Sequence, residues 1–127
     1  MTYAEIIASM PYGLDKVILS RLNEHIGKEN AIKRPDLLAK VHEHFDCHEV
    51  TDRQMRKIIN DMRKQGILIC SIASEDGGYF LAENLIEYHE FARRELGAKI
   101  ADMSESLQAM DRAAKEIFGD AAQMSLI

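Results

Sequence analysis

The sequence predicts a mainly α-helical protein with one small β-hairpin and a long C-terminal helix. Three features predict it: a capped basic helix over Thr51–Gln65, two short apolar segments around a Gly-Gly turn directly after it, and an apolar seam that continues to Phe118. We expect three regions. Residues 1–13 form an N-terminal arm or short helix, 14–82 a globular domain and 83–127 a C-terminal helical segment.

Two helices are predicted before the first connector. Thr2–Met10 is expected to be a short helix, ended by the restriction that Pro11 places on the residue before it. Leu14–Ile26 is expected to be a longer helix that stops at Gly27. Its apolar positions recur at helical spacing and predict the buried face Leu14, Val17, Ile18, Leu22 and Ile26.

The connector Lys28–Arg34 leads into another predicted helix. Within it, Ile32 is placed as a short edge strand beside the hairpin. Pro35 suits the first position of a helix, where a missing N–H costs nothing. The apolar face of this helix comprises Leu37, Leu38, Val41 and Phe45, and Asp46–Val50 forms the turn that follows.

The basic helix has a predicted start, face and end. Thr51 and Gln54 fit a capping box, and Asp52 suits the positive end of the helix dipole. Gly66 stands where a left-handed residue ends a helix. The positions that share its apolar face are Met55, Ile58, Ile59 and Met62.

The hairpin follows at once. Ile67–Ile72 is too short for a helix and rich in β-branched residues, so it predicts a strand. Ser74–Gly78 has turn composition, and Tyr79–Leu81 supplies the return strand. The turn carries Glu75 and Asp76 and no Lys or Arg, so we expect it to close the core rather than to contact phosphate.

The segments ENAIKRPDLLAKV, VTDRQMRKIINDMRKQGILICS and GGYFLA resemble the small winged helix-turn-helix proteins of bacteriophages and prophages. The resemblance covers roughly Val17–Leu81 and rests on patterning. It implies three core helices, a wing, and DNA binding through Thr51–Lys64. One departure is the segment HEHFDCHEV, which is longer than the tight turn usual before the recognition helix in that group.

The position of the basic helix, after a helix and before a hairpin, predicts contact with the major groove. Arg53, Gln54 and Lys57 lie near its N-terminal end and are expected to read bases, Gln54 suiting adenine and Arg53 guanine. Phosphate contacts are expected from Arg56, Arg63 and Lys64, with Lys33 and Arg34. The full predicted DNA-binding set is Lys33, Arg34, Thr51, Arg53, Gln54, Arg56, Lys57, Asn60, Arg63 and Lys64.

The net charge of −5 is unevenly distributed. Residues 1–66 hold eleven Lys and Arg against ten Asp and Glu, whereas residues 67–127 hold five against eleven. A local basic face on an acidic protein suffices for groove binding, with a modest electrostatic share of the affinity.

The C-terminal segment from Asn84 to Phe118 reads as a long helix with a one-residue offset of its apolar positions near Gly97. At ~1.5 Å per residue this helix would be about 50 Å long, against ~30 Å for a compact domain of the preceding residues, so it would extend beyond the domain and its apolar seam would need a partner. We expect a second copy to provide it as a coiled coil or an interlocked helical pair. The predicted homodimer residues are Leu96, Ile100, Met103, Leu107, Met110, Ala114 and Ile117.

His42, His44, Cys47 and His48 are close in sequence, but their spacing matches no standard zinc finger. We expect a turn in which Cys47 is buried and the histidines are solvated, with no metal and no cofactor. The sequence has no phosphate loop, nucleophile elbow or metalloprotease motif, so it does not predict an enzyme.

These observations predict a sequence-specific, dimeric double-stranded-DNA-binding protein, a transcriptional regulator of the phage or mobile-element type. The alternative is a winged-helix protein-protein interaction module in a replication or packaging assembly, without direct DNA contact. The two cysteines and the absence of an apolar run of about 18 residues favour a cytoplasmic protein that does not enter a membrane. No small-molecule ligand is predicted.

Overall fold

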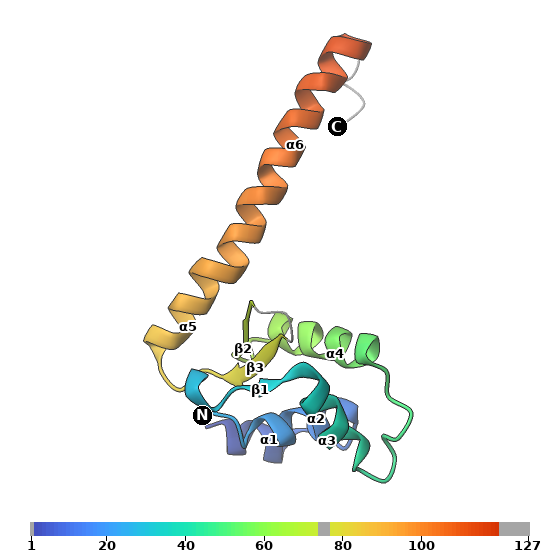
Figure 1. Cartoon of the computed structure of the whole chain (residues 1–127), viewed down its shortest axis with the longest axis vertical. Coiled ribbons are helices and arrows are strands. Elements are labelled where there is room, and N and C mark those ends of the chain that lie inside the picture. The colour runs from blue at the N-terminus through green and yellow to red at the C-terminus, as the bar shows by residue number, and fades with distance from the viewer. Residues whose placement is uncertain (1, 74–76, 120–127) are drawn as a thin grey trace. The chain divides into compact units, whose positions relative to one another are not determined.

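The computed structural model describes residues 2–73 and 77–119, which are mainly helical with one small antiparallel sheet (Figure 1). The chain divides into two compact units, Met1–Phe91 and Ala92–Ile127. The elements are α1 (Tyr3–Ser9), α2 (Leu14–Leu22), a 3₁₀ turn (Lys28–Asn30), β1 (Ile32–Lys33), α3 (Arg34–His42), α4 (Asp52–Lys64), β2 (Ile69–Ile72), β3 (Gly78–Leu81), α5 (Leu85–Phe91), a π-helical turn (Ala92–Leu96) and α6 (Gly97–Phe118).

The sheet has the strand order β1-β3-β2, with both neighbouring pairs antiparallel. Ile32 pairs with Tyr79, which confirms the predicted edge strand beside the hairpin. Gly77 enters β3 with φ +61°, a conformation that favours glycine. Glu75 and Asp76, on which the expectation for the wing depended, lie outside the described residues.

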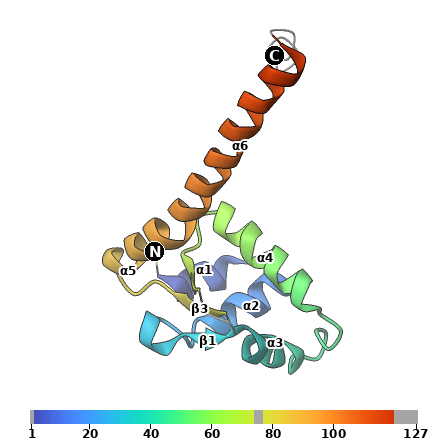
Figure 2. The same cartoon turned by 45° about the horizontal axis from the view of Figure 1, so that its top comes forward.

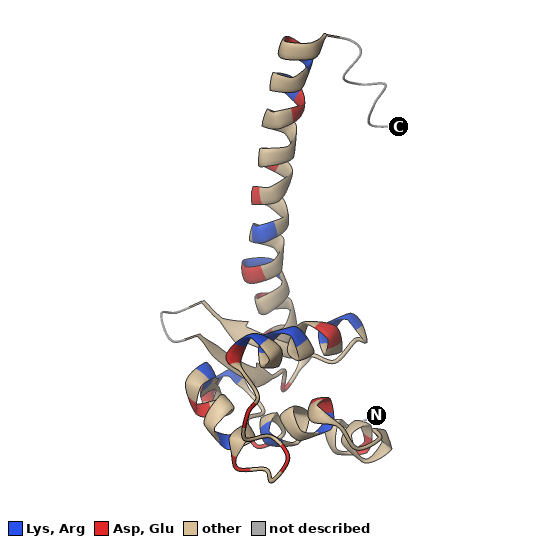
Figure 3. Cartoon of the chain, turned by 90° about the vertical axis from the view of Figure 1, so that its right-hand side faces the viewer, with Lys and Arg blue, Asp and Glu red and all other residues tan. Residues whose placement is uncertain are grey.

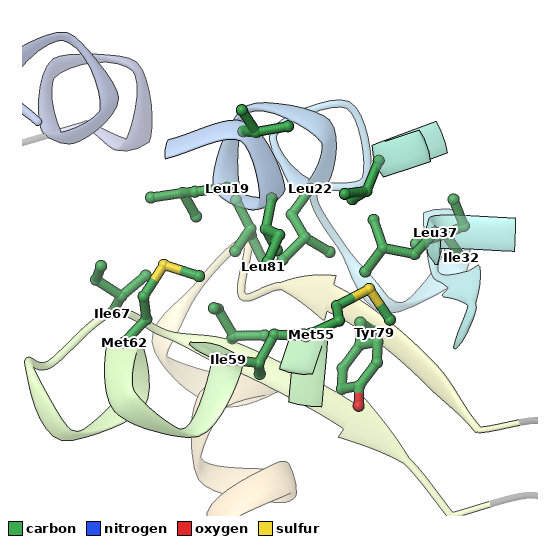
Figure 4. Packing of buried hydrophobic residues seen from close by; sticks show 14 of the residues in the cluster. Leu19, Leu22, Ile32, Leu37, Met55, Ile59, Met62, Ile67, Tyr79 and Leu81 are labelled. Carbon is green, nitrogen blue, oxygen red and sulfur yellow. The ribbon is translucent and has the colours of Figure 1, made fainter. Parts of the chain in front are cut away.

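The core of the first unit lies between the sheet and three helices, α2, α3 and α4 (Figure 2). Side chains of α4 point toward α2 and β3 (Figure 4), and the residues that meet there are Leu19, Leu22, Met55, Ile59, Met62 and Leu81. β3 is buried along its whole length because its other face is also covered. There Phe80 packs with Cys70 and with Phe91 of α5.

The first unit continues through α5 and ends at Phe91. Phe91 is only 7% exposed and belongs to the cluster under the sheet. At the other end, α1 confirms the short helix expected before Pro11. Tyr3 of α1 donates a hydrogen bond from its Oη to the Ala82 carbonyl at 2.7 Å, which ties the arm to the end of β3.

The second predicted helix is shorter than expected, because α2 ends at Leu22 rather than at Ile26. The Leu81 amide donates to the His25 carbonyl at 3.0 Å, and the Gly27 amide donates to the Leu81 carbonyl at 2.8 Å. Ile26 therefore forms a parallel bridge with Leu81. Pairing with a strand that lies far along the chain draws these residues out of the helix.

Phe45 is not part of the apolar face of α3, so this prediction is wrong. The helix ends at His42, and Phe45 is 75% exposed with its ring stacked on His44 at a centroid distance of 4.9 Å. Leu37 and Val41 are fully buried as expected. A turn begins where the helical spacing would have continued, and the phenylalanine ring lies on its outside.

The C-terminal segment is helical from Leu85 to Phe118, and its middle turn, Ala92–Leu96, is π-helical. A π turn contains one residue more than an α-helical register allows, which explains the one-residue offset of the apolar positions near Gly97. None of the residues of α6 is buried. Among the described residues, no helix is both long enough and apolar enough to span a membrane.

Candidate nucleic-acid interface

α4 begins and ends as its sequence predicts. The Gln54 amide donates to Thr51 Oγ1 at 3.1 Å, and the Thr51 amide donates to Gln54 Oε1 at 2.9 Å, so both bonds of the capping box form. Gly66 follows the helix with φ +91°, the left-handed conformation of a helix stop. Both ends of the helix are therefore defined by hydrogen bonds or backbone conformation within a few residues.

The exposed face of α4 carries a regular polar stripe. Met55, Ile59 and Met62 are at most 1% exposed and orient the helix on the core. The side opposite them at 3.6 residues per turn holds four exposed residues at positions i, i+4, i+7 and i+11. We call these residues the outer stripe: Arg53, Lys57, Asn60 and Lys64.

A cluster of two arginines and one carboxylate flanks the outer stripe. Asp52 forms ion pairs with both arginines. Its Oδ2 lies 2.9 Å from Arg56 Nε, and its Oδ1 lies 3.1 Å from Arg34 Nε. The three side chains remain between 36% and 50% exposed. Asp52 thus holds the N-terminus of α3 against the first turn of α4, and the cluster carries one net positive charge at the surface.

The charge of the outer stripe is partly compensated. Lys57 Nζ lies 3.5 Å from Asp61 Oδ2 in a pair spaced i, i+4, and its side chain is 77% exposed. Pairs this exposed are weak, so the lysine can exchange Asp61 for another anion at little cost. Figure 3 shows the Lys and Arg positions of α4 in blue. Lys33, on β1, is also exposed.

Arg63 has a different environment from that expected of a phosphate contact. Its Nε donates to the Ile69 carbonyl at 2.7 Å, and its guanidinium lies 5.1 Å from the centroid of the Phe91 ring. One terminal nitrogen, Nη2, is buried without a protein partner, and burial lowers the pKa of the group. We therefore remove Arg63 from the set of residues expected to contact phosphate: it joins α4 to β2 and α5.

Gln54 has two roles that compete. A bidentate contact with adenine uses both the amide oxygen and the amide nitrogen of a glutamine. In the structure the oxygen accepts the Thr51 amide. Reading adenine would thus require this bond of the capping box to open, whereas Arg53 and Lys57 on the outer stripe need no such change.

The last residue of α3 and the turn that follows it contain the four residues that were considered as metal ligands: His42, His44, Cys47 and His48. Cys47 is 4% exposed, which confirms that it is buried, and its Sγ lies 4.0 Å from His44 Nδ1. His42 Nε2 is hydrogen bonded to the Val50 carbonyl at 2.6 Å. No group of three or more His, Cys, Asp or Glu within residues 2–73 and 77–119 has an arrangement that could hold a metal.

Sequence reasoning missed two features of this surface. The bridge from Arg56 to Asp52 has the i, i+4 spacing of a helix pair and could have been found from that spacing. The packing of Arg63 against Phe91 could not, because the two residues lie on different elements far apart in the chain.

None of the family models, curated proteins or solved structures compared with this chain matches it. The functional argument therefore depends on the geometry of α4 and its surroundings.

Proposed function

We propose that this chain is a winged-helix protein that binds double-stranded DNA by inserting α4 into the major groove. Its element order supports the proposal: helix, short strand, two helices, then a two-stranded hairpin that pairs with the first strand. In such domains the helix before the hairpin is the recognition helix. We propose further that the protein acts as a dimeric transcriptional regulator of the phage or mobile-element type, the group that its sequence resembles.

The outer stripe is the observation that carries the proposal. It places Arg53, Lys57 and Lys64 on the side of α4 opposite the core, with Asn60 between them. Arg and Lys pair with guanine edges, and Asn with adenine. The stripe is about 17 Å long at ~1.5 Å per residue, close to one half-turn of the ~34 Å DNA repeat.

The flanking cluster supplies phosphate contacts in the proposed complex. Arg34 and Arg56 are both turned toward Asp52, and each retains N–H groups beyond the one in that pair. A phosphate near Asp52 would meet two guanidinium groups whose positions are set in the free protein. Asp52 would weaken this contact while orienting both groups.

Binding to a random duplex of about 30 base pairs, measured by fluorescence anisotropy at several salt concentrations, tests the proposal. Phosphate contacts by Lys33, Arg34, Arg56 and Lys64 predict a slope of log affinity against log salt of about −3.6, at ~0.9 per contact. The triple variant Arg53→Ala, Lys57→Ala, Lys64→Ala is expected to weaken binding and to flatten the slope by about 0.9, because only Lys64 of the three is assigned to a phosphate.

The control for this experiment removes the same charge elsewhere. Arg94, Arg112 and Lys115 lie outside α4 and are exposed. Their triple alanine variant is expected to bind like the unchanged protein. If a folded protein fails to bind at low salt, or if the two triple variants lose binding equally, DNA binding through α4 is wrong.

A second candidate function is docking to a protein partner. Tyr12 and Phe45 are 62% and 75% exposed, and both rings lie against His44, with centroids 5.9 and 4.9 Å away. Exposed aromatic residues are enriched at protein interfaces. If this surface is the functional one, Phe45→Ala abolishes capture of the partner and leaves DNA binding unchanged.

A further inference from the structure

Large apolar residues of α6 share one face of the helix, and none of them is buried. The large residues of this face are between 62% and 72% exposed. The face repeats in alternating steps of three and four residues, the spacing of positions a and d in a heptad. We call it the α6 seam, and its residues are Ile100, Met103, Leu107, Met110, Ala114 and Ile117.

We propose that two copies of the chain pair through the α6 seam with their helices antiparallel, so that Ile100 of one copy packs beside the partner's Ile117. This inference rests on the proposed function, because the pair is what would present two recognition helices to one duplex. It adds the orientation and the register of the pair. The orientation follows from the composition of the seam, and the register follows from the exposure of its residues.

The small residue in the seam argues against a parallel pair. In a parallel, in-register pair every seam residue faces its own copy, so Ala114 would face the partner's Ala114 between bulky layers of Met110 and Ile117. Two methyl groups cannot fill that layer, and an unfilled layer loses dispersion contacts. In the antiparallel pair Ala114 faces the partner's Met103, whose long flexible side chain fills irregular gaps.

The residues that flank the seam also fail to support a parallel pair. Parallel coiled coils are held in register by opposite charges at positions g and e of neighbouring helices. Here those positions would pair Lys99 with Ser104, Ser106 with Asp111, and Ala113 with Phe118. Opposite charges meet in none of these pairs, and charged residues lie instead on the outside of α6, at Asp102, Glu105, Arg112, Lys115 and Glu116.

Exposure decides the register. Moving the antiparallel pair by one heptad would cover Leu96 instead of Ile117. Leu96 belongs to the π turn and is 38% exposed, whereas Ile117 is 71% exposed. The proposed register covers the more exposed residue and keeps every paired residue within the regular helix α6.

The area that becomes buried is sufficient for a stable pair. Burying one apolar side chain of this size removes about 60–120 Å² of surface from water. This area is its transfer free energy divided by ~25 cal/mol per Å². Five large residues from each copy therefore bury roughly 600–1,200 Å². With the flanking side chains the total reaches the lower end of the standard range for specific interfaces, about 1,200–2,000 Å².

The orientation of the helices determines the distance between the two points at which the chains enter the helix pair. In the proposed register the two Ala92 residues are separated by about 50 Å along the helix axes, at ~1.5 Å per residue. A parallel pair would hold them about 10 Å apart, the interaxial distance. Half-sites on DNA would be spaced accordingly.

Cysteine cross-linking of the full-length protein tests the orientation. The variants Ile100→Cys and Ile117→Cys are purified separately, and then each alone and an equilibrated equal mixture are oxidised and separated without reductant. We expect a disulfide-linked dimer from the mixture only. The unchanged protein, whose Cys47 and Cys70 are buried, supplies the baseline.

A matched control uses the outer face at the same level of the helix pair. This control mixes the variants Glu105→Cys and Arg112→Cys. Their cysteines would lie at the same level of the proposed pair but point away from the partner, so no cross-link is expected. Met103→Cys mixed with Ala114→Cys is a second seam pair, used if circular dichroism shows that the first variants fail to fold.

Three results would overturn the antiparallel pair. Cross-linking of either single variant with itself indicates a parallel pair or no defined register. Equal cross-linking of the seam mixture and the outer-face mixture indicates random collision. If no seam mixture cross-links while the unchanged protein still binds DNA in the anisotropy experiment, this inference fails and the proposed function stands.

Discussion

At the residue scale, Arg63 shows that a basic side chain of α4 can be held by groups within its own compact unit. Its hydrophobic stem and planar head lie against β2 and α5, and its hydrogen bond to the Ile69 carbonyl is short at 2.7 Å. Arginine suits such a position because its guanidinium is weakly hydrated and stacks on aromatic rings. Arg53, ten residues earlier on the same helix, is exposed.

Replacing these two arginines is expected to separate stability from binding. Arg63→Ala removes a charged hydrogen bond and a cation–π contact, so the free energy of unfolding should fall by about 1–3 kcal/mol. Arg53→Ala should change it by less than ~0.5 kcal/mol, as at most exposed sites. Urea denaturation followed by circular dichroism measures both, and equal losses would contradict the structural role of Arg63.

Tyr3 predicts a dependence of stability on pH. Burial raises its pKa to about 12 from 10.0, with further contributions from the charges of Cys70 and Glu87. Because the pKa is higher in the folded state, the stabilisation is fully present below pH 10 and is lost as the pH rises toward 12.

We therefore expect the free energy of unfolding to fall between pH 10 and 12 by less in Tyr3→Phe than in the unchanged protein. At pH 7 the variant should lose about 0.5–1.5 kcal/mol, the value of its hydrogen bond to the Ala82 carbonyl. Denaturation at a series of pH values measures both effects. Parallel pH profiles for the two proteins would show that Tyr3 does not titrate in this way.

At the element scale, α4 is defined at its N-terminus by a reciprocal pair of hydrogen bonds between Thr51 and Gln54. These two residues lie on either side of Arg53, the first residue of the outer stripe that is proposed to enter the groove. Their cap fixes the direction from which the chain enters the helix, and so it fixes where Arg53 emerges. The cap of α4 thus contributes to the position of its side chains as well as to its stability.

Removing the cap is expected to destabilise α4. Thr51→Ala should lower the free energy of unfolding by about 1 kcal/mol, because an orphan amide of the first turn loses its acceptor. Thr51→Ser keeps the hydroxyl and is the control. Its expected loss in free energy of unfolding is only a few tenths of the loss expected for Thr51→Ala. Thermal denaturation of the three proteins tests this, and equal stability of all three would show that the cap does not stabilise the helix.

The C-terminal helix shows how an irregularity in an element can be found in a sequence. The apolar positions shift by one residue near Gly97, and a π turn occupies Ala92–Leu96. The extra residue of that turn restarts the register of α6. The π turn therefore lets the residues before and after it follow different apolar patterns within one helical segment.

At the scale of the whole molecule, the two compact units differ in how their apolar residues are used. The first unit buries residues on both faces of its sheet. In the second, α6 has no buried residue, and its large apolar side chains are exposed. The proposed pairing of two copies would cover these side chains.

A charge introduced into the seam is expected to separate the copies. Leu107→Asp would place a carboxylate in the middle of the pair, so sedimentation should show a monomer at tens of micromolar where the unchanged protein is a dimer. DNA affinity should fall by about 10²-fold, because the second recognition helix no longer benefits from the first. Gln108→Asp, one residue away on the outside of α6, should remain dimeric. If the unchanged protein sediments as a monomer at this concentration, the proposed self-association is wrong.

The sequence by itself determined the features that depend on a few neighbouring residues. The cap and the glycine stop of α4, its buried stripe, the edge strand at Ile32 and the shifted seam near Gly97 were all predicted from local chemistry or spacing. These features could be predicted because hydrogen bonds within one turn and the periods of helices and strands act over short stretches of chain.

The tertiary structure decided what depends on contacts between distant residues. It ended α2 at Leu22 through pairing with Leu81, left Phe45 exposed, and packed the partly buried Arg63 against Phe91. In each case a local pattern allowed more than one outcome, and packing against an element elsewhere in the chain selected one. The helix α4 and the basic residues on it could thus be predicted from the sequence, whereas the packing of Arg63 depended on the folded core.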